Sequence, residues 1–422
     1  MFCFALCLAL LLAGCAPLTM QNINDLLRAP ELGQGQGEVQ KALAAYLGEQ
    51  PEYKYPKEGG MRSPLIVEDL NGDGVNEGIL LYSLANSSTP GRSGNVYVAV
   101  LEQQEDEWVV TQDLEGAGSE VASFELADLF DNGQKQIVVG YASANLNTKI
   151  FSLYEYADGQ LADLIYPAAY SRYELADFSG QGGMSLVIVS PDDQLGGLNL
   201  QYIPPKEGVL DLSLTPIKLD TNFSSCAGIY PSSSSEGQLL VVDGVTETQV
   251  LASEILHFSG EHFFKVDDGG TIVGETARTN PLLNTRDIDG DEVVEIPRRV
   301  GMTEIVTLAG DKHLEYVEWM DFTTEEPKSK QFGIVDSDKG VYIRLPEPWR
   351  ENIRIEDGKQ SGEWSIRDTA TRATLLTLEI FDGGQAPPMD AILVSRISDA
   401  YLVLSSSLPS YERNTIAVVS LT

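Results

Sequence analysis

Two nine-residue segments of the chain place oxygen-bearing side chains at positions 1, 3, 5 and 9, and position 7 can add its main-chain carbonyl oxygen. The ligands predicted from this spacing are Asp69, Asn71, Asp73, Val75 and Glu77 in the first segment, and Asp287, Asp289, Asp291, Val293 and Glu295 in the second. A short loop with these oxygens can enclose a hard cation such as Ca²⁺, which takes about six to eight oxygen ligands. The sequence therefore predicts two structural calcium sites. The alternative is a pair of acidic turns that hold no ion.

The first segment is better suited to a sharp turn than the second. Position 6 is Gly74 in the first segment and Glu292 in the second. Glycine adopts the left-handed backbone of such a turn without strain, whereas a residue with a side chain is strained there.

Three further segments keep the frame of this motif and lose most of its ligands. They begin near Asp128, Asp177 and Tyr230, and the last has a run of serines where the acids would stand. Together with the acidic segments they start about 50 to 60 residues apart, in the range of the larger propeller-type repeats. The motif therefore marks a repeated unit. Ion binding is predicted in the first and last copies and stays open in the three between them.

The elements that must position these loops are predicted to be short β-strands. In the second repeat, strands are expected at residues 121–127, 136–141, 149–156 and 161–166, with the degenerate loop after the first and a turn at Asp158-Gly159 before the last. The first repeat has the same order, at residues 65–67, 78–82, 95–101 and 108–112. Four strands per unit without intervening helices is the pattern of propeller blades. Convincing helical periodicity occurs only at residues 38–47.

The predicted fold is all-β: a β-propeller-like array of about five four-stranded repeats, a small β-rich C-terminal module and one short N-terminal helix. Residues 15–60 are assigned to a lipidated tether and the helix, residues 61–330 to the propeller and residues 331–422 to the module. Strands of the module are expected near residues 341–345, 352–355, 362–367, 374–381, 391–396, 400–405 and 415–421. The alternative is that this last part supplies further blades that close the ring.

The N-terminus resembles a bacterial lipoprotein signal. An apolar run too short to span a bilayer, which takes ~20 residues, ends in Leu12-Ala13-Gly14-Cys15. The resemblance to a lipobox implies cleavage after residues 1–14, a diacylglyceryl group on the sulfur of Cys15, and anchoring on the outer face of the bacterial cytoplasmic membrane. An ordinary secretory signal is the alternative. Cys226 would then be the lone thiol of the mature chain, and we expect it to be buried as a small apolar residue.

The charge balance excludes one class of partner. The chain has 28 basic and 63 acidic residues, a formal net charge of −35, whereas nucleic-acid binding requires a basic surface. The sequence contains none of the short motifs for an exposed serine nucleophile, a phosphate-binding loop or a zinc protease. A carboxylate pair for glycoside chemistry stays open, because only spatial separation is diagnostic of one.

The motif Asp-x-Asn/Asp-Gly-Asp-Gly, followed by a run such as Ile-Leu-Leu, resembles the FG-GAP/VCBS type of repeat of integrin-like propellers and many bacterial surface proteins. With the lipobox and the early segment Tyr55-Pro56-Lys57, the chain is similar to a set of uncharacterised Firmicutes surface lipoproteins. The resemblance covers roughly residues 12–300 and extends to the β-rich C-terminal part. It implies a propeller with calcium-type loops and no particular activity.

These observations favour a lipid-anchored extracellular surface protein that acts as a binding or scaffolding module for a cell-envelope or extracellular ligand, either a protein or a glycan. The first alternative is a carbohydrate-active enzyme, which requires two close carboxylates with split pKa values in a propeller pocket. A structural or sensory subunit that works with a membrane partner is the second alternative.

Overall fold

The computed structural model describes residues 34–84, 93–105, 107–234, 237–267, 269–300, 314–322, 327–350, 352–357, 363–382, 392–397, 400–405 and 415–421. The predicted signal peptide and Cys15 lie outside the described residues. Within these ranges, antiparallel strands form six sheets of four or five strands and one two-stranded ribbon. The fold is therefore nearly all β, as predicted from the strand pattern.

The first three sheets contain strands β1 to β15. Sheet 1 consists of β1 (Glu52–Tyr53), β2 (Leu65–Glu68), β3 (Glu77–Ser83), β4 (Tyr97–Gln104) and β5 (Glu107–Glu115). Sheet 2 consists of β6 (Glu120–Ala127), β7 (Gln136–Ala142), β8 (Lys149–Ala157) and β9 (Gln160–Ala169). Sheet 3 consists of β10 (Arg172–Ala176), β11 (Ser185–Pro191), β12 (Leu198–Ile203) and β15 (Ile217–Lys218), and β13 (Pro205–Lys206) pairs with β14 (Val209–Leu210) in the ribbon.

The other three sheets contain strands β16 to β29. Sheet 4 consists of β16 (Phe223–Ser234), β17 (Gly237–Thr246), β18 (Leu251–Phe258) and β19 (Phe263–Lys265), and the short helix α4 (Thr271–Glu275) follows it. Sheet 5 consists of β20 (Ile296–Arg299), β21 (Leu314–Asp321), β22 (Lys328–Asp336), β23 (Val341–Leu345) and β29 (Ala417–Ser420). After the 3₁₀ turn η1 (Glu347–Trp349), sheet 6 consists of β24 (Ile353–Asp357), β25 (Glu363–Asp368), β26 (Thr374–Asp382), β27 (Ile392–Ile397) and β28 (Ala400–Ser405).

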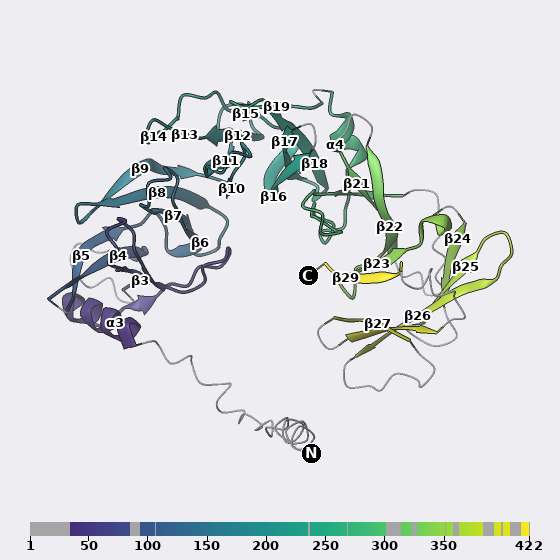
Figure 1. Cartoon of the computed structure of the whole chain (residues 1–422), viewed down its shortest axis with the longest axis horizontal. Coiled ribbons are helices and arrows are strands. Elements are labelled where there is room, and N and C mark those ends of the chain that lie inside the picture. The colour runs from purple at the N-terminus through teal and green to yellow at the C-terminus, as the bar shows by residue number, and fades with distance from the viewer. Residues whose placement is uncertain are drawn as a thin grey trace, which may run out of the picture.

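The sheets follow one another along an arc in chain order, and the arc is open between the first sheet and the last (Figure 1). In sheets 2 and 3 the first strand, β6 or β10, lies on the concave side, and β9 lies on the convex side (Figure 1). All residues of β3 and β7 are buried, whereas β9 is mostly exposed. A strand packed between two neighbouring sheets is apolar on both faces, which explains the continuous apolar runs in the sequence.

Each pair of neighbouring sheets shares a hydrophobic core. The shared cores include Leu81 with Val139 for sheets 1 and 2, Leu153 with Leu186 for sheets 2 and 3, Val187 with Leu240 for sheets 3 and 4, Ile255 with Ile296 for sheets 4 and 5, and Ile334 with Ile366 for sheets 5 and 6. In such a stack each repeat buries its apolar faces only against its neighbours. The stability of one sheet therefore depends on the sheets beside it.

An N-terminal helix covers the face of sheet 1 that sheet 2 leaves free. This helix, α3 (Gln34–Leu47), buries Val39 and Leu43 completely against a cluster that includes Tyr82. The approach is close, because a Cβ at Gly78 would lie 2.9 Å from a methyl carbon of Val39. The predicted helix is confirmed and begins earlier than expected. However, α3 and β1, which pairs with β3, belong to the folded body rather than to a tether that ends at residue 60.

The predicted boundary at residue 330 falls inside β22 and is wrong for this fold. The C-terminal strand β29 returns to pair with β23, so sheet 5 contains strands from both sides of that boundary. Sheet 6 is formed by the chain between them and shares a core with sheet 5. The last acidic loop motif precedes β20, but the strands continue after it. The loss of the motif therefore does not mark the end of the array.

The degenerate copy predicted near Tyr230 is not a loop. Tyr230 lies inside β16, which runs to Ser234 and pairs directly with β17 from Gly237 onward. The serines of this segment alternate along a strand, with Ser232 buried and Ser233 exposed. A short hairpin connection therefore replaces the loop in sheet 4.

Two further expectations concern single features of the chain. Cys226 is buried with 8% of its surface exposed, as predicted, and burial raises the pKa of its thiol to about 12. The thiol is therefore unreactive at neutral pH. None of the helices in the described ranges has the length and apolar character needed to cross a membrane.

We expect Leu43→Ala to lower the free energy of unfolding by about 2–5 kcal/mol, because the residue fills a core between the helix and sheet 1. Tyr46→Ala on the same helix is the matched control, since Tyr46 is 55% exposed. Denaturant unfolding measures both changes. Equal stability of the two variants would contradict the role of α3 as a packed part of sheet 1.

Candidate functional site

Four loops share one backbone shape. The loops at residues 69–77, 128–136, 177–185 and 287–295 have positive φ angles at positions 4 and 6, which are Gly72 and Gly74, Asp131 and Gly133, Gly180 and Gly182, and Gly290 and Glu292. In each loop the aspartate at position 1 accepts a hydrogen bond from the amide of position 6, at 2.9, 2.8, 2.5 and 2.9 Å in chain order. The aspartate and the backbone therefore define the turn, and Glu292 adopts the same left-handed conformation as the glycines.

The last loop brings three acidic groups together. Asp287, Asp289 and Glu295 each offer an oxygen, and these atoms lie within 4.8 Å of one another. Glu295 is completely buried, and its Oε2 accepts a hydrogen bond of 3.0 Å from the amide of Ile288. Its Oε1 is buried without a hydrogen-bond partner among the described residues. A buried carboxylate oxygen without a partner is unfavourable, and a cation bound by the cluster would provide one.

The charges of this cluster repel one another. The pKa of Glu295 is raised to about 7, mainly by burial and also by the negative charges of Asp289 and Asp291, against the lowering effect of the Ile288 amide. The pKa of Asp289 is also raised, first by burial and then by Asp291. Both shifts have the same causes, burial and neighbouring negative charges, and a cation bound there would oppose them. The cluster could therefore hold a metal ion.

One predicted ligand of this loop, Asp291, is also paired with a cation. Asp291 accepts a hydrogen bond of 2.7 Å from the ammonium group of Lys330 on β22, which holds the pKa of Asp291 below its usual value. A second oxygen of Asp291 accepts the amide of Val293 at 3.0 Å. Lys330 was not anticipated from the sequence, because it lies far from the loop in the chain.

The first loop satisfies its own acids more fully. Glu77 is 2% exposed and accepts hydrogen bonds from the amide of Leu70 at 2.8 Å and from the side chain of Asn71 at 3.3 Å. Burial nevertheless raises the pKa of Glu77, and Asp73 and Asp69 raise it further. The predicted ligand Val75 donates its amide to Asp73 at 2.7 Å. A neutral amide at position 3 makes this loop less anionic than the last one.

The two middle loops show the same fold without the acid at position 9. In the loop at 128–136 the buried Gln136 replaces the glutamate and accepts the amide of Leu129 at 2.8 Å. In the loop at 177–185 position 9 is the buried Ser185, which lies 3.4 Å from the hydroxyl of Tyr202. These loops keep the turn and lack the buried negative charge.

A buried ion pair fixes the chain that leads into the last loop. Arg278 and Asp243 are 1% and 0% exposed and lie 2.8 Å apart. Asp243 also accepts hydrogen bonds from the amide of Thr285 at 2.8 Å and from the hydroxyl of Ser253 at 2.6 Å. Breaking a buried pair of this kind costs about 3–5 kcal/mol. The pair therefore anchors the segment before Asp287 to β17 and β18.

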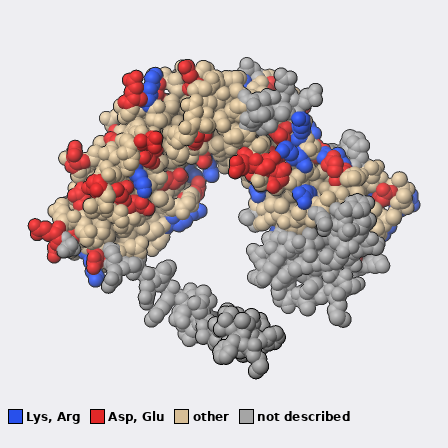
Figure 2. All heavy atoms as spheres, in the orientation of Figure 1, with Lys and Arg blue, Asp and Glu red and all other residues tan. Residues whose placement is uncertain are grey.

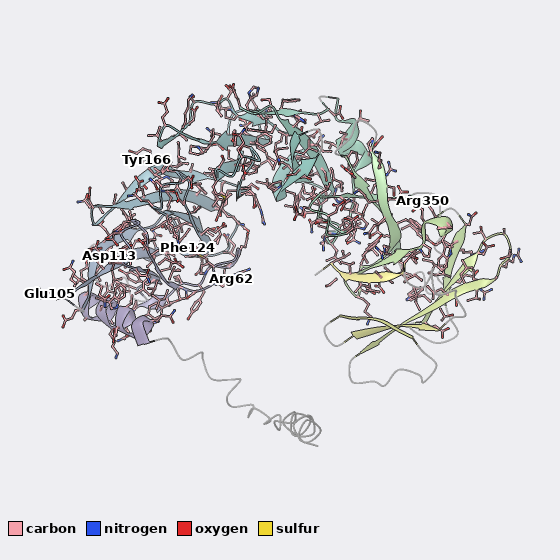
Figure 3. All side chains as sticks on the ribbon, viewed as in Figure 1. Arg62, Glu105, Asp113, Phe124, Tyr166 and Arg350 are labelled. Carbon is pink, nitrogen blue, oxygen red and sulfur yellow. The ribbon has the colours of Figure 1, made fainter. Side chains whose placement is uncertain are left out.

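A polar pocket lies between sheets 2 and 3 near the concave side of the arc. It has a volume of ≈ 220 Å³ and is lined by Glu58, Gly59, Gly60, Ser123, Glu125, Lys149, Tyr170, Ser171, Arg172, Tyr173 and Glu174. Acidic and basic side chains lie side by side along this edge (Figure 2). Figure 3 labels two neighbours, Phe124 on β6 and Arg62, whose Nε donates a hydrogen bond of 2.9 Å to the carbonyl oxygen of Gly59.

Two of the acids in the pocket are Glu125 and Glu174. The pKa of Glu174 is raised to about 7, mainly by burial and also by the charge of Glu125, while Arg172 lowers it. Glu125 accepts a hydrogen bond of 3.0 Å from the hydroxyl of Tyr173. The sequence left such a pair open, because the two carboxylates come from separated parts of the chain, β6 and β10.

No family model and no curated protein matches the chain. Among solved structures, an exotype rhamnogalacturonan lyase is similar at 9% identity and a TM-score of 0.28, over 68% of this chain and 65% of the lyase. A hypothetical protein from Leishmania major matches at 12% identity and a TM-score of 0.24, over 53% of this chain and 75% of that protein. Levansucrase from Bacillus subtilis matches at 8% identity and a TM-score of 0.25, over 71% and 92%. These likenesses are too distant to assign an activity.

We expect calcium to raise the unfolding temperature of the wild-type protein and Glu295→Gln to reduce this rise. A ligand at 100 times its dissociation constant adds about 2.7 kcal/mol to stability. Glutamine keeps the acceptor for the Ile288 amide, as Gln136 does for Leu129 in the second loop. The variant without calcium should therefore be at least as stable as the wild type, because it buries no uncompensated charge.

Thermal unfolding with EGTA, CaCl₂ and MgCl₂ measures this prediction. The matched control is Glu292→Gln, which removes a charge from the same loop outside the predicted ligand set. An equal calcium response in the wild type and in Glu295→Gln would contradict ion binding by this cluster.

We expect the stability of the protein to fall as the pH rises from about 4.5 to about 7 through the titration of Glu174. The pKa of this carboxyl is raised from the usual 4.5 to about 7 in the folded protein, so the folded state binds the proton more tightly than the unfolded state in this range. The groups of the pocket that face it are Glu58, Glu125, Lys149, Tyr170, Arg172 and Tyr173.

Glu174→Gln should remove this part of the pH dependence. The measurement is denaturant unfolding of both proteins across the range. Parallel pH profiles for the wild type and the variant would show that Glu174 does not titrate in this way.

Proposed function

We propose that this chain is a lipid-anchored extracellular surface protein whose calcium-stabilised β-propeller repeats form a binding or scaffolding module for a cell-envelope or extracellular ligand. The observation that carries the proposal is the buried Glu295, which lies close to Asp287 and Asp289. Its Oε1 has no hydrogen-bond partner among the described residues. An oxygen-only cluster on a short loop suits Ca²⁺, because calcium prefers carboxylates and carbonyl oxygens. Extracellular calcium modules bind at about 10⁻⁴–10⁻³ M, which fits a structural ion outside the cell.

The position of the loops supports a structural role for the ion. The first and second loops lie against each other, since the amide of Lys135 donates to the carbonyl oxygen of Leu70 at 2.8 Å. The last loop is joined to sheet 4 by a hydrogen bond of 3.1 Å from the amide of Val294 to the hydroxyl of Ser232. An ion at such a position would stiffen the junction between neighbouring sheets and leave the concave side free for a ligand.

The membrane anchor is part of the same proposal. The segment Leu12-Ala13-Gly14-Cys15 precedes the folded body by a short stretch, and two acyl chains on one cysteine suffice for stable anchoring. The net charge of −35 argues against a nucleic-acid partner. A surface-bound array with an accessible concave side is suited to a protein or glycan ligand.

A carbohydrate-active enzyme is the second candidate function. The observation in its favour is the pair of Glu125 and Glu174 in one pocket, with the pKa of Glu174 raised to about 7. Glycosidases use a pair of carboxyl groups, of which the one with the raised pKa acts as the general acid. Hydrolysis of a polysaccharide that requires both carboxylates would identify this activity.

We expect the full chain, produced in a Gram-positive host, to partition into the detergent phase and to be digested by protease added outside intact cells. Cys15→Ser should move the protein to the aqueous phase, because it loses the acyl anchor. Cys226→Ser is the matched control, since that thiol is buried within the fold. Detergent partition of Cys15→Ser equal to that of the wild type would contradict the anchor.

A further inference from the structure

The pocket between sheets 2 and 3 combines a cationic pair with an acidic pair. Lys149 on β8 and Arg172 on β10 supply the positive charges, and Glu125 on β6 and Glu174 on β10 supply the negative ones. A third acid, Glu58, lies near both cations, 2.7 Å from Lys149 and 3.5 Å from Arg172. The cations therefore share one carboxylate, and among the described residues no cation forms an ion pair with Glu125 or Glu174.

Glu174 and Arg172 can form further hydrogen bonds to a ligand. The described residues form no hydrogen bond or ion pair with the carboxylate of Glu174. Among these residues Arg172 contacts only Glu58, at 3.5 Å, and 41% of its side chain is exposed. The hydroxyl of Tyr173 donates to Glu125 and lies within hydrogen-bond distance of the Ser123 hydroxyl, each at 3.0 Å, and so completes the polar wall. A group that donates hydrogen bonds would fit beside Glu174, and an anionic group would fit beside Arg172.

The walls of the pocket are fixed by backbone and side-chain hydrogen bonds. A bulge in β6 between Val121 and Ser123 turns the carbonyl oxygen of Ala122 toward the N-terminal segment, and it accepts the amide of Glu58 at 2.7 Å. The hydroxyl of Ser171 accepts the amide of Cys226 at 2.8 Å, which ties the other wall to sheet 4. A site held in this way loses little freedom when a ligand binds.

We propose that this pocket binds a small zwitterion of the α-amino-acid class, with its ammonium group at Glu125 and Glu174 and its carboxylate at Arg172. The proposal rests on the proposed function as an extracellular binding module and adds a small-molecule ligand to it. The volume of ≈ 220 Å³ is below the range of about 300–1,000 Å³ typical of drug-sized ligands, so one small molecule fills it.

Other small ligands fit less well. A simple anion would meet the negative field of a chain with a net charge of −35. A sugar ring usually needs an exposed aromatic face, and the two aromatic rings of the lining, Tyr170 and Tyr173, are only 6% and 8% exposed. A zwitterion satisfies both charged pairs at once and adds no net charge.

Isothermal titration of the calcium-replete protein with the common L-α-amino acids, each tested singly, is the first experiment. We expect saturable binding of at least one amino acid with one site per chain. Ethanolamine, which has the ammonium group alone, acetate, which has the carboxylate alone, and D-glucose should bind at least about tenfold more weakly. Failure of every amino acid to bind, or binding of glucose as tight as that of the best amino acid, would overturn the proposal.

Three variants locate the site. Glu174→Gln and Arg172→Gln should each weaken binding by about tenfold or more, because each removes a charge-assisted hydrogen bond. Glu261→Gln, at an exposed position outside the pocket, should bind like the wild type. Unchanged affinity in both pocket variants would also overturn the proposal.

The failure of this proposal can be distinguished from the failure of the proposed function. A protein that is stabilised by calcium and anchored through Cys15 but binds no amino acid would lose only the ligand assignment. The comparison of amino acids with ethanolamine and acetate uses the wild-type protein alone, so it gives an answer even if a pocket variant does not fold.

Discussion

The hydrogen bond from the amide of position 6 to the aspartate of position 1 determines the shape of every acidic loop in this protein. It is present in four loops with different side chains at the remaining positions. Because the aspartate is satisfied by the backbone, the turn does not depend on an acid at position 9. That position varies from glutamate in the outer copies to Gln136 and Ser185 in the middle ones.

The second constraint is that no sheet buries both of its faces by itself. Sheets 2 to 5 have a neighbouring sheet on each side, and the shared cores connect them in chain order. Sheet 1 has a neighbour on one side only, and the helix α3 covers its other face through Val39 and Leu43. At the far end, β29 adds an outer strand to sheet 5, and sheet 6 covers the core beside it. An element outside the repeat, the helix α3, therefore covers the first end of the array.

The strands and loops could be predicted from the sequence because their signals are local. The apolar run at residues 136–141 and the turn Asp158-Gly159 identify β7, β8 and β9 almost to the residue. The loop ligands Asp287, Asp289 and Glu295 follow from spacing alone, and the structure brings them together. The error near Tyr230 arose because a serine-rich strand and a degenerate loop have similar compositions. The boundary at residue 330 was wrong because the motif ends before the strand pairing does.

The pocket and the ion pairs could not be predicted, because their residues are distant in the chain. Lys330 reaches Asp291 only after β22 has paired with β21. Glu174 has an unusual pKa only because sheets 2 and 3 bury it near Glu125. Asp243 and Arg278 form a buried ion pair, but they are far apart in the sequence, and nothing in the residues around either one indicates the pairing. Such sites depend on tertiary contacts and have no short-range pattern.

The helix α3 also has a consequence for association between copies of the chain. If the outer apolar face of sheet 1 were uncovered, it could pack against a sheet face of a second molecule, as neighbouring sheets pack within one molecule. Contacts of this head-to-tail kind do not close into a ring and can extend into fibres. Because Val39 and Leu43 occupy that face, a second molecule cannot add its own sheet there. The helix therefore acts as a stop against filament growth, which matters most where many copies of the chain are concentrated together.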